Sequence, residues 1–190
     1  PYAEDTESVP GFGDLLRDGA HNLMLQYQRI LGPRAVNSLR FGFNRFNRDL
    51  QPENATTDVG QLWGVHWLNV PARDFGYPIM TVAGYSRLGD AYSLPILRQT
   101  NTYQIVEALT LTRGRHLVQV GGEIRHQRLD GRLDMLTRGS LSFSGMISGS
   151  GLSDLLLGFP SFGLQATSDN PIELQTTACN VYAQDDWDAV

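Results

Sequence analysis

Two pairs of long segments in this chain alternate polar and apolar residues, and a very tight turn joins the two members of each pair. In the clearer pair, the turn is Arg113-Gly114-Arg115. On each side of this turn the apolar residues share one parity, that is, they lie an even number of positions apart. They are Tyr103, Ile105, Leu109 and Leu111 before the turn, and Val118, Val120 and Ile124 after it. Successive side chains of a strand point to opposite faces, so the pattern predicts a β-hairpin with one apolar and one polar face.

An earlier pair of segments shows the same pattern around the turn Leu31-Gly32-Pro33-Arg34. Its alternating apolar residues are Leu23, Leu25, Tyr27, Leu39, Phe41 and Phe43. Proline suits the turn because its missing N–H is not needed there. A fifth long strand is expected over residues 174–187, with Val181, Ala183 and Trp187 on one parity.

Long connections separate these hairpins, at about residues 50–100 and 130–171, and residues 1–20 are also expected to form a loop. The second connection contains a possible short strand at 140–144 and a helical turn at 152–158. Such long connections are unusual in compact soluble domains but ordinary for the extracellular loops of outer-membrane barrels. We therefore predict an all-β, antiparallel up-and-down meander that forms part of a transmembrane β-barrel, with the tight turns facing the periplasm.

Composition narrows the class of protein. The net charge of -5 argues against nucleic acid as a partner. No apolar run approaches the roughly 20 residues of a transmembrane helix, and the single cysteine, Cys179, excludes an internal disulfide. The chain begins at Pro1 without a signal peptide and ends directly after a strand-like segment, so we interpret it as a segment of a longer protein.

The polar parity of the strands is expected to face the hydrated lumen of the barrel. The candidate lumen-facing residues are Arg40, Asn44, Gln104, Gln119, Glu123 and Arg125. Glu107 breaks the apolar parity, and a carboxylate that faces the middle of a bilayer is costly. Either a bulge redirects Glu107 or the residue lies near a membrane surface; otherwise it counts against a barrel.

Aromatic residues of the first long connection are the candidate ligand-binding residues, because flat rings stack on sugars and other flat ligands. They are Trp63, Trp67, Tyr77 and Tyr85. The competing interpretation is packing of the loop on itself.

The sequence contains no pattern that indicates catalysis, a metal or a cofactor. The four histidines His21, His66, His116 and His126 lack ligand-type spacing. Asp185 and Asp186 are adjacent on a strand and so point to opposite faces. No G-x-S-x-G elbow with a partnered His-Asp arrangement accompanies the serines at 140–153. We therefore expect a protein that binds or transports, not an enzyme.

Several stretches, taken in order, resemble the barrel of TonB-dependent receptors, most closely the Oar-like subgroup whose members contain a carboxypeptidase regulatory domain. These stretches are Asn101-Thr102-Tyr103-Gln104, Leu109 to His116, Gly121 to Arg125, Gly84 to Asp90, Gly151 to Pro160 and Tyr182-Ala183-Gln184-Asp185-Asp186-Trp187. The resemblance extends from about His21 to Trp187. Each motif is weak alone, and the ordered series is more specific.

The resemblance implies a 22-stranded barrel closed by an N-terminal plug, located in the outer membrane. Such receptors import siderophores, vitamins or glycans with energy that TonB delivers from the inner membrane. Neither a plug nor a TonB box is recognisable in this chain, and five long strands cannot close such a barrel. The expected partners are therefore outer-membrane lipid, a small-molecule or glycan ligand, and TonB only through a plug that lies outside the chain.

Two other classes of protein remain open at this point. A soluble all-β carbohydrate-binding module would also alternate, with its apolar face turned toward a core instead of lipid. A surface adhesin or structural β-assembly would pair exposed strand edges between chains. Burial of Phe41, Phe43, Leu109, Leu111, Val118 and Val120 inside a compact body would exclude the membrane interpretation.

Overall fold

The computed structural model describes residues 2–4, 9–167 and 169–188 and divides into two compact units. The strand unit comprises Gly19–Asn47, Gln99–Asp130 and Glu173–Val190. The loop unit comprises Pro1–Asp18, Arg48–Arg98 and Gly131–Ile172.

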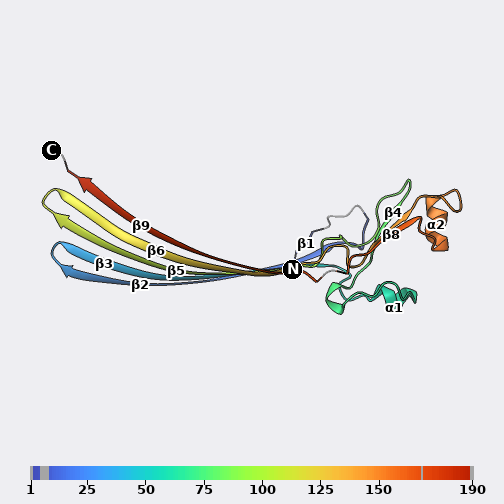
Figure 1. Cartoon of the computed structure of the whole chain (residues 1–190), viewed down its shortest axis with the longest axis horizontal. Helices are drawn as coiled ribbons and strands as arrows, with labels where there is room; N and C mark the ends of the chain where they lie inside the picture. Colours follow the sequence, from blue (N-terminus) through green and yellow to red (C-terminus); the bar gives the residue numbers. More distant parts are fainter. Residues whose placement is uncertain (1, 5–8, 168, 189–190) are drawn as a thin grey trace. The chain divides into compact units, whose positions relative to one another are not determined.

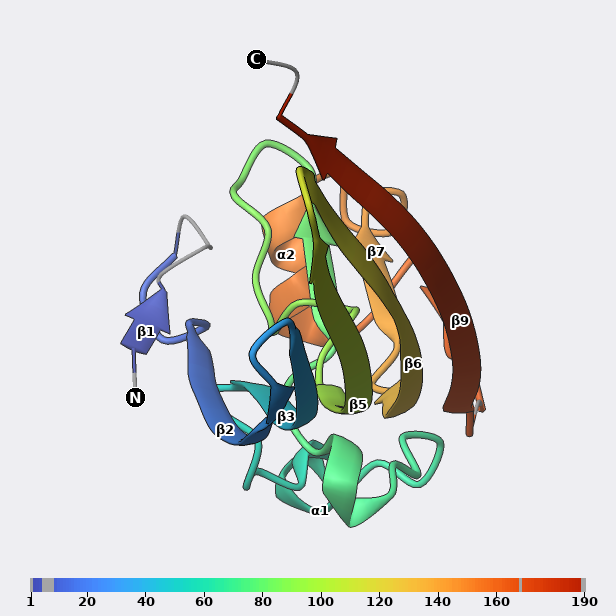
Figure 2. The same ribbon diagram turned by 90° about the vertical axis from the view of Figure 1, so that its left-hand side faces the viewer.

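Six strands form one sheet in the order β1-β2-β3-β5-β6-β9 (Figure 1). They are β1 (Tyr2–Glu4), β2 (Asp14–Gly32), β3 (Ala35–Pro52), β5 (Ile96–Arg113), β6 (His116–Leu133) and β9 (Pro171–Trp187). Figure 2 shows β2, β3, β5, β6 and β9 in this order as a curved sheet. The predicted antiparallel meander is confirmed, and the described part of the sheet does not close into a barrel.

Tight turns join β2 to β3 and β5 to β6, where the sequence predicts them. The second turn contains Gly114 at φ 62°, a left-handed conformation that glycine adopts without the steric penalty of a side chain. The turn therefore requires this glycine, and the register of the hairpin follows from it.

The prediction that residues 1–20 form a loop is wrong, although residues 1 and 5–8 lie outside the described part. Strand β2 begins at Asp14, and β1 pairs with it through Tyr2↔Leu16, Ala3↔Leu15 and Glu4↔Asp14. The side chains of Asp14–Asp18 do not alternate in polarity, so their pattern gave no signal. Backbone pairing produces this extension of the strand.

The loop unit contains a second, three-stranded sheet in the order β4-β7-β8, formed by β4 (Ile79–Val82), β7 (Ser140–Phe143) and β8 (Phe162–Leu164). Strand β7 pairs parallel with β4 and antiparallel with β8. Helices α1 (Val59–Trp63), η1 (Ala72–Asp74) and α2 (Gly151–Leu157) complete the unit. The short strand near 140 and the helical turn near 152 appear as predicted; α1, β4 and β8 were not predicted.

The buried hydrophobic core lies in the loop unit. Met80 and Val82 of β4 pack with Leu141 and Phe143 of β7, and Leu155 of α2 packs against this cluster. Alternating residues of both strands supply the cluster, as expected for one face of a sheet. Across the described residues, no helix has the length and apolar character needed to cross a membrane.

Candidate functional site

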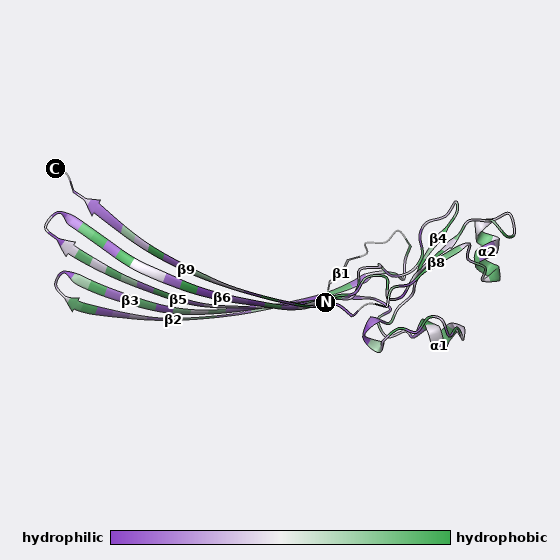
Figure 3. Ribbon diagram, in the orientation of Figure 1, coloured by the Kyte–Doolittle hydropathy of each residue, from purple (hydrophilic) through white to green (hydrophobic). Residues whose placement is uncertain are grey.

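The apolar face of the strand unit is exposed. Ile105 is 48% exposed and Ile124 is 53% exposed, although both belong to the predicted apolar parity. Phe41, Phe43, Leu109, Leu111, Val118 and Val120 are all exposed or half-buried, and none belongs to the buried core. Figure 3 shows apolar and polar residues interspersed along these strands. A large apolar surface that no described part of the chain covers fits lipid contact and not a soluble sandwich.

The register of β3 and β5 places Glu107 on this apolar face. Thr112 donates its backbone N–H to the carbonyl of Arg34 at 2.8 Å, and the rings of Phe43 and Tyr103 lie 5.2 Å apart. Both contacts fit one register, so no bulge shifts the strands between them. The amide of Asn37, which shares the parity of Phe43, donates to the Glu107 carboxylate.

The length of the apolar face matches a membrane crossing. On β5 the apolar parity extends from Leu111 to Tyr103, and Asn101 follows with the same parity. On β3 the apolar parity ends at Phe43, and Arg45 is the next residue of the same parity. The segment of β5 is close to the ~9–11 residues of a tilted transmembrane strand. Glu107 therefore lies near the middle of the apolar band and away from both of its boundaries.

The opposite face of the sheet is polar and hydrogen-bonded between strands. Arg40 donates Nη2–H to the Gln26 amide oxygen at 3.3 Å, and the Asn44 amide donates to Asn22. These pairs step by four residues along both strands, so they share one face. Gln104 of β5 lies against Gly42 of β3 on this face.

The remaining candidate lumen residues lie on β6. Arg125 Nη2 and Glu123 Oε1 are 2.7 Å apart and form an ion pair, and Gln119 is half-buried. All six residues named from the sequence therefore lie on polar-parity positions, and five of them contact a polar or glycine partner. Their contact with a hydrated lumen remains a prediction.

Aromatic and charged side chains meet at the turn end of β6 and β9. The rings of His116 and Trp187 are stacked with centroids 6.0 Å apart, and His116 Nδ1 lies 2.8 Å from Asp185 Oδ2. Asp186 instead accepts a hydrogen bond from Gln184 at 3.1 Å. The two aspartates thus lie on opposite faces, as alternation requires, and form no joint cation site.

A groove of about 570 Å³ lies in the loop unit, and Trp63 and Trp67 line it. The remaining apolar lining includes Met80, Leu141, Phe143 and Leu155. Its size falls in the range of ~300–1,000 Å³ typical of small-molecule sites.

The other two candidate aromatic residues lie outside this groove. Tyr77 packs beside Trp63 with ring centroids 6.1 Å apart, and Phe12 packs edge-on against Tyr77 at 5.8 Å. Tyr85 lines a separate, smaller groove of about 250 Å³. The structure thus brings Trp63 and Trp67 together, and the binding role of all four residues remains a prediction.

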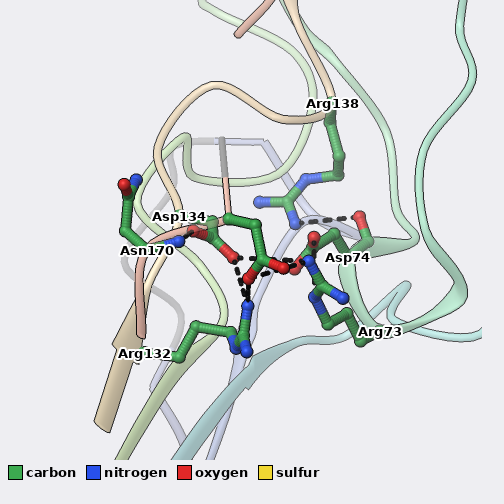
Figure 4. Close-up of polar contacts among 7 residues, drawn as sticks. Arg73, Asp74, Arg132, Asp134, Arg138 and Asn170 are labelled. Carbon is green, nitrogen blue, oxygen red and sulfur yellow. Dashed lines mark hydrogen bonds and ion pairs between the residues drawn. The ribbon is translucent and has the colours of Figure 1, made fainter. Parts of the chain in front are cut away.

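The sequence did not reveal a buried cluster of charges in the loop unit, which Figure 4 shows. Asp74 and Asp134 are fully buried, and Arg73 lies 3.5 Å from the first and 3.9 Å from the second. Arg132 lies 3.5 Å from Asp134, which also accepts the backbone N–H of Asn170 at 2.7 Å. Arg73 and Asp74 are far in the sequence from Arg132 and Asp134, so only folding brings the two groups together.

Burial changes the acidity of groups in the loop unit. Desolvation raises the pKa of Asp74 and lowers the pKa of the Arg138 guanidinium. Arg138 donates to the backbone carbonyls of Asp74 and Ala91, and so joins segments of two long connections. Within the described ranges, no group of three or more His, Cys, Asp or Glu side chains is arranged to bind a metal ion.

The antiparallel meander, with an exposed apolar band on one face and paired polar groups on the other, defines an outer-membrane β-barrel protein. A family model described as outer membrane beta barrel domain matches residues 2–190, so the chain belongs to this family and is located in the outer membrane. The soluble-module interpretation is thereby set aside. Neither a curated protein nor a solved structure matches the chain.

Proposed function

We propose that this chain supplies barrel strands and two ligand-binding loops to a TonB-dependent outer-membrane receptor. In this proposal the parent protein binds a small molecule at the cell surface and imports it with energy delivered by TonB. The protein acts by binding and transport and catalyses no reaction.

The observation that carries the proposal is the combination of a barrel sheet with a folded loop unit. The connections between β3 and β5 and between β6 and β9 pack together through the parallel pairing of β4 with β7. Binding residues lie disproportionately on loops that a rigid scaffold positions, so loops that fold around a core of their own suit the capture of a ligand. The ordered motifs that resemble TonB-dependent receptors support the same conclusion.

The polar face of the sheet supports the proposal of a barrel whose interior holds water or a plug. Arg40, Asn44 and Gln104 present amide and guanidinium groups on the face away from lipid. Barrel interiors that enclose water or a plug require such groups. In addition, the outer edge of β9 is unpaired in the described sheet, and an unpaired edge in lipid costs several kcal/mol per backbone group. Further strands must therefore complete the barrel.

Binding of TonB tests the proposal without knowledge of the ligand. The full-length protein, purified in detergent, should retain the periplasmic domain of TonB. The 190-residue chain alone should not retain it, because it contains no recognisable TonB box. A full-length protein that never binds TonB would refute the transport mechanism and leave the outer-membrane barrel intact.

A further inference from the structure

The groove lined by Trp63 and Trp67 has a chemical character that restricts its ligand. The two indole rings come from α1 and the segment that follows it, whereas Met80, Leu141 and Phe143 come from the buried faces of β4 and β7. Trp63 is 39% exposed and Trp67 is 50% exposed, so both rings present surface to an entering molecule. A flat apolar ligand would bury this surface.

Among the described residues, no ionisable side chain lines the groove. A charged ligand would therefore enter without a counter-charge, and burial of an unpaired charge is strongly unfavourable. Three arginines of the loop unit already have partners outside the groove. Arg73 and Arg132 pair with buried aspartates, and Arg138 donates to backbone carbonyls. The groove thus selects against anionic ligands.

Directional polar groups in the groove are few. Of the lining residues that the structure describes, only Gln165 has a carboxamide, and its Nε2–H already donates to the Thr137 carbonyl at 2.9 Å. Its amide oxygen and the indole N–H groups of Trp63 and Trp67 remain for a ligand. A glycan buries many hydroxyl groups, and each buried hydroxyl without a partner costs free energy. The lining therefore favours a ligand with one or two polar atoms.

We propose that the groove binds an uncharged, mainly apolar and flat small molecule that carries a hydrogen-bond acceptor, and not a ferric siderophore anion or a glycan. This inference rests on the proposed function, since it names the class of ligand that the receptor captures. Trp63 and Trp67 stack on the ligand, their N–H groups donate to its acceptor, and the faces of β4 and β7 form the floor of the site.

Two related photoprobes test the charge preference. Benzophenone is neutral and has one carbonyl acceptor, and 4-benzoylbenzoate is the same scaffold with one added carboxylate. Full-length protein in outer-membrane vesicles is irradiated with each probe, and the labelled peptides are mapped by mass spectrometry. Benzophenone should label segments 63–67 and 155–165 saturably, at a concentration at least about tenfold lower than 4-benzoylbenzoate requires.

Variants assign the labelling to the groove. Trp67→Ala should weaken labelling by about two- to tenfold, the expected loss of one aromatic contact. Tyr92→Ala is the matched control, because Tyr92 is an exposed aromatic residue of the loop unit that does not line the groove, and it should leave labelling unchanged. Leu164→Lys places a cation at an exposed lining position and should increase labelling by 4-benzoylbenzoate.

Three results would overturn the proposal: equal labelling by both probes in the unmodified protein, labelling confined to other segments, or no effect of Trp67→Ala. The gain of anionic labelling in Leu164→Lys distinguishes a folded, altered groove from a misfolded one. The assay requires neither TonB nor transport, so its failure is separate from failure of the proposed function.

Discussion

The assignment of faces on β6 predicts that arginine costs much more stability at one of two adjacent positions than at the other. Val120 lies on the apolar parity and is 37% exposed, whereas Gln119 lies on the polar parity and is half-buried. Val120 is four residues from the start of β6 at His116, which corresponds to a depth of about 10 Å at about 3.3 Å per residue and a tilt of about 40°. It therefore lies near the middle of an apolar band about 25 Å thick.

An arginine at this depth on the lipid face costs about 2–4 kcal/mol, so Val120→Arg should lower the folding equilibrium constant by at least about thirtyfold. Gln119→Arg adds the same side chain to the face that carries Arg125 and Glu123, and should cost less than about 1 kcal/mol.

Guanidinium unfolding of the full-length protein in phospholipid vesicles measures this difference, and the heat-modifiable mobility of the barrel on gels measures its assembly. Val120→Leu is the control for any change in packing at the same site. The reasoning fails if Gln119→Arg is the more damaging substitution, because the polar face would then be the one in contact with lipid.

Three further predictions concern single residues. Asn37→Leu removes the hydrogen-bond donor to the Glu107 carboxylate within the apolar band, and should destabilise the barrel by about 1–3 kcal/mol. Glu107→Leu removes the carboxylate itself and should not destabilise the barrel. Equal losses of stability in vesicle unfolding would contradict this pairing. In the loop unit, Gly89→Ala should cause local unfolding detectable by hydrogen exchange, because the new Cβ would lie 1.9 Å from the Pro78 carbonyl oxygen. Gly84 also has a positive φ but has open space around it, so Gly84→Ala should lower the stability by only about 1–2 kcal/mol. Burial raises the pKa of Asp74, so the folded loop unit binds a proton more readily than the unfolded chain does. The stability of the loop unit should therefore fall as the pH rises from the ordinary aspartate pKa through the raised value. Asp74→Asn should flatten that dependence in pH-resolved hydrogen exchange, and an unchanged slope would show that other groups cause it.

Strand periodicity was readable from the sequence because it depends on local physics. Alternation from Tyr103 to Leu111 and the turn at Gly114 predicted both the hairpin and its faces, since side-chain direction in a strand follows residue number alone. The same alternation placed the candidate lumen residues, including Arg40 and Asn44, on the polar face. The strand extension from Asp14 escaped prediction because pairing with β1, and not side-chain pattern, creates it.

Glu107 shows the limit of this local reasoning. The sequence indicated that the residue interrupts the apolar parity, and that without a bulge or a boundary position it would count against a barrel. The register of β3 and β5 shows neither of these, and supplies Asn37 as a hydrogen-bond partner from the adjacent strand. The chain belongs to the barrel family all the same, so that criterion was wrong. A cross-strand partner depends on the register of two segments some seventy residues apart, which the local pattern does not specify.

The loop unit was decided by tertiary structure alone. Parallel pairing of β4 with β7 joins two connections that are sixty residues apart, and it creates both the buried core and the groove beside Trp63 and Trp67. Asp134 also meets Arg73, which comes from the other long connection, only because the two connections pack together. The sequence by itself thus determined the membrane-facing hairpins, because strand alternation is a local property. The shape and chemistry of the candidate ligand site arose from long-range packing, which no local pattern encodes.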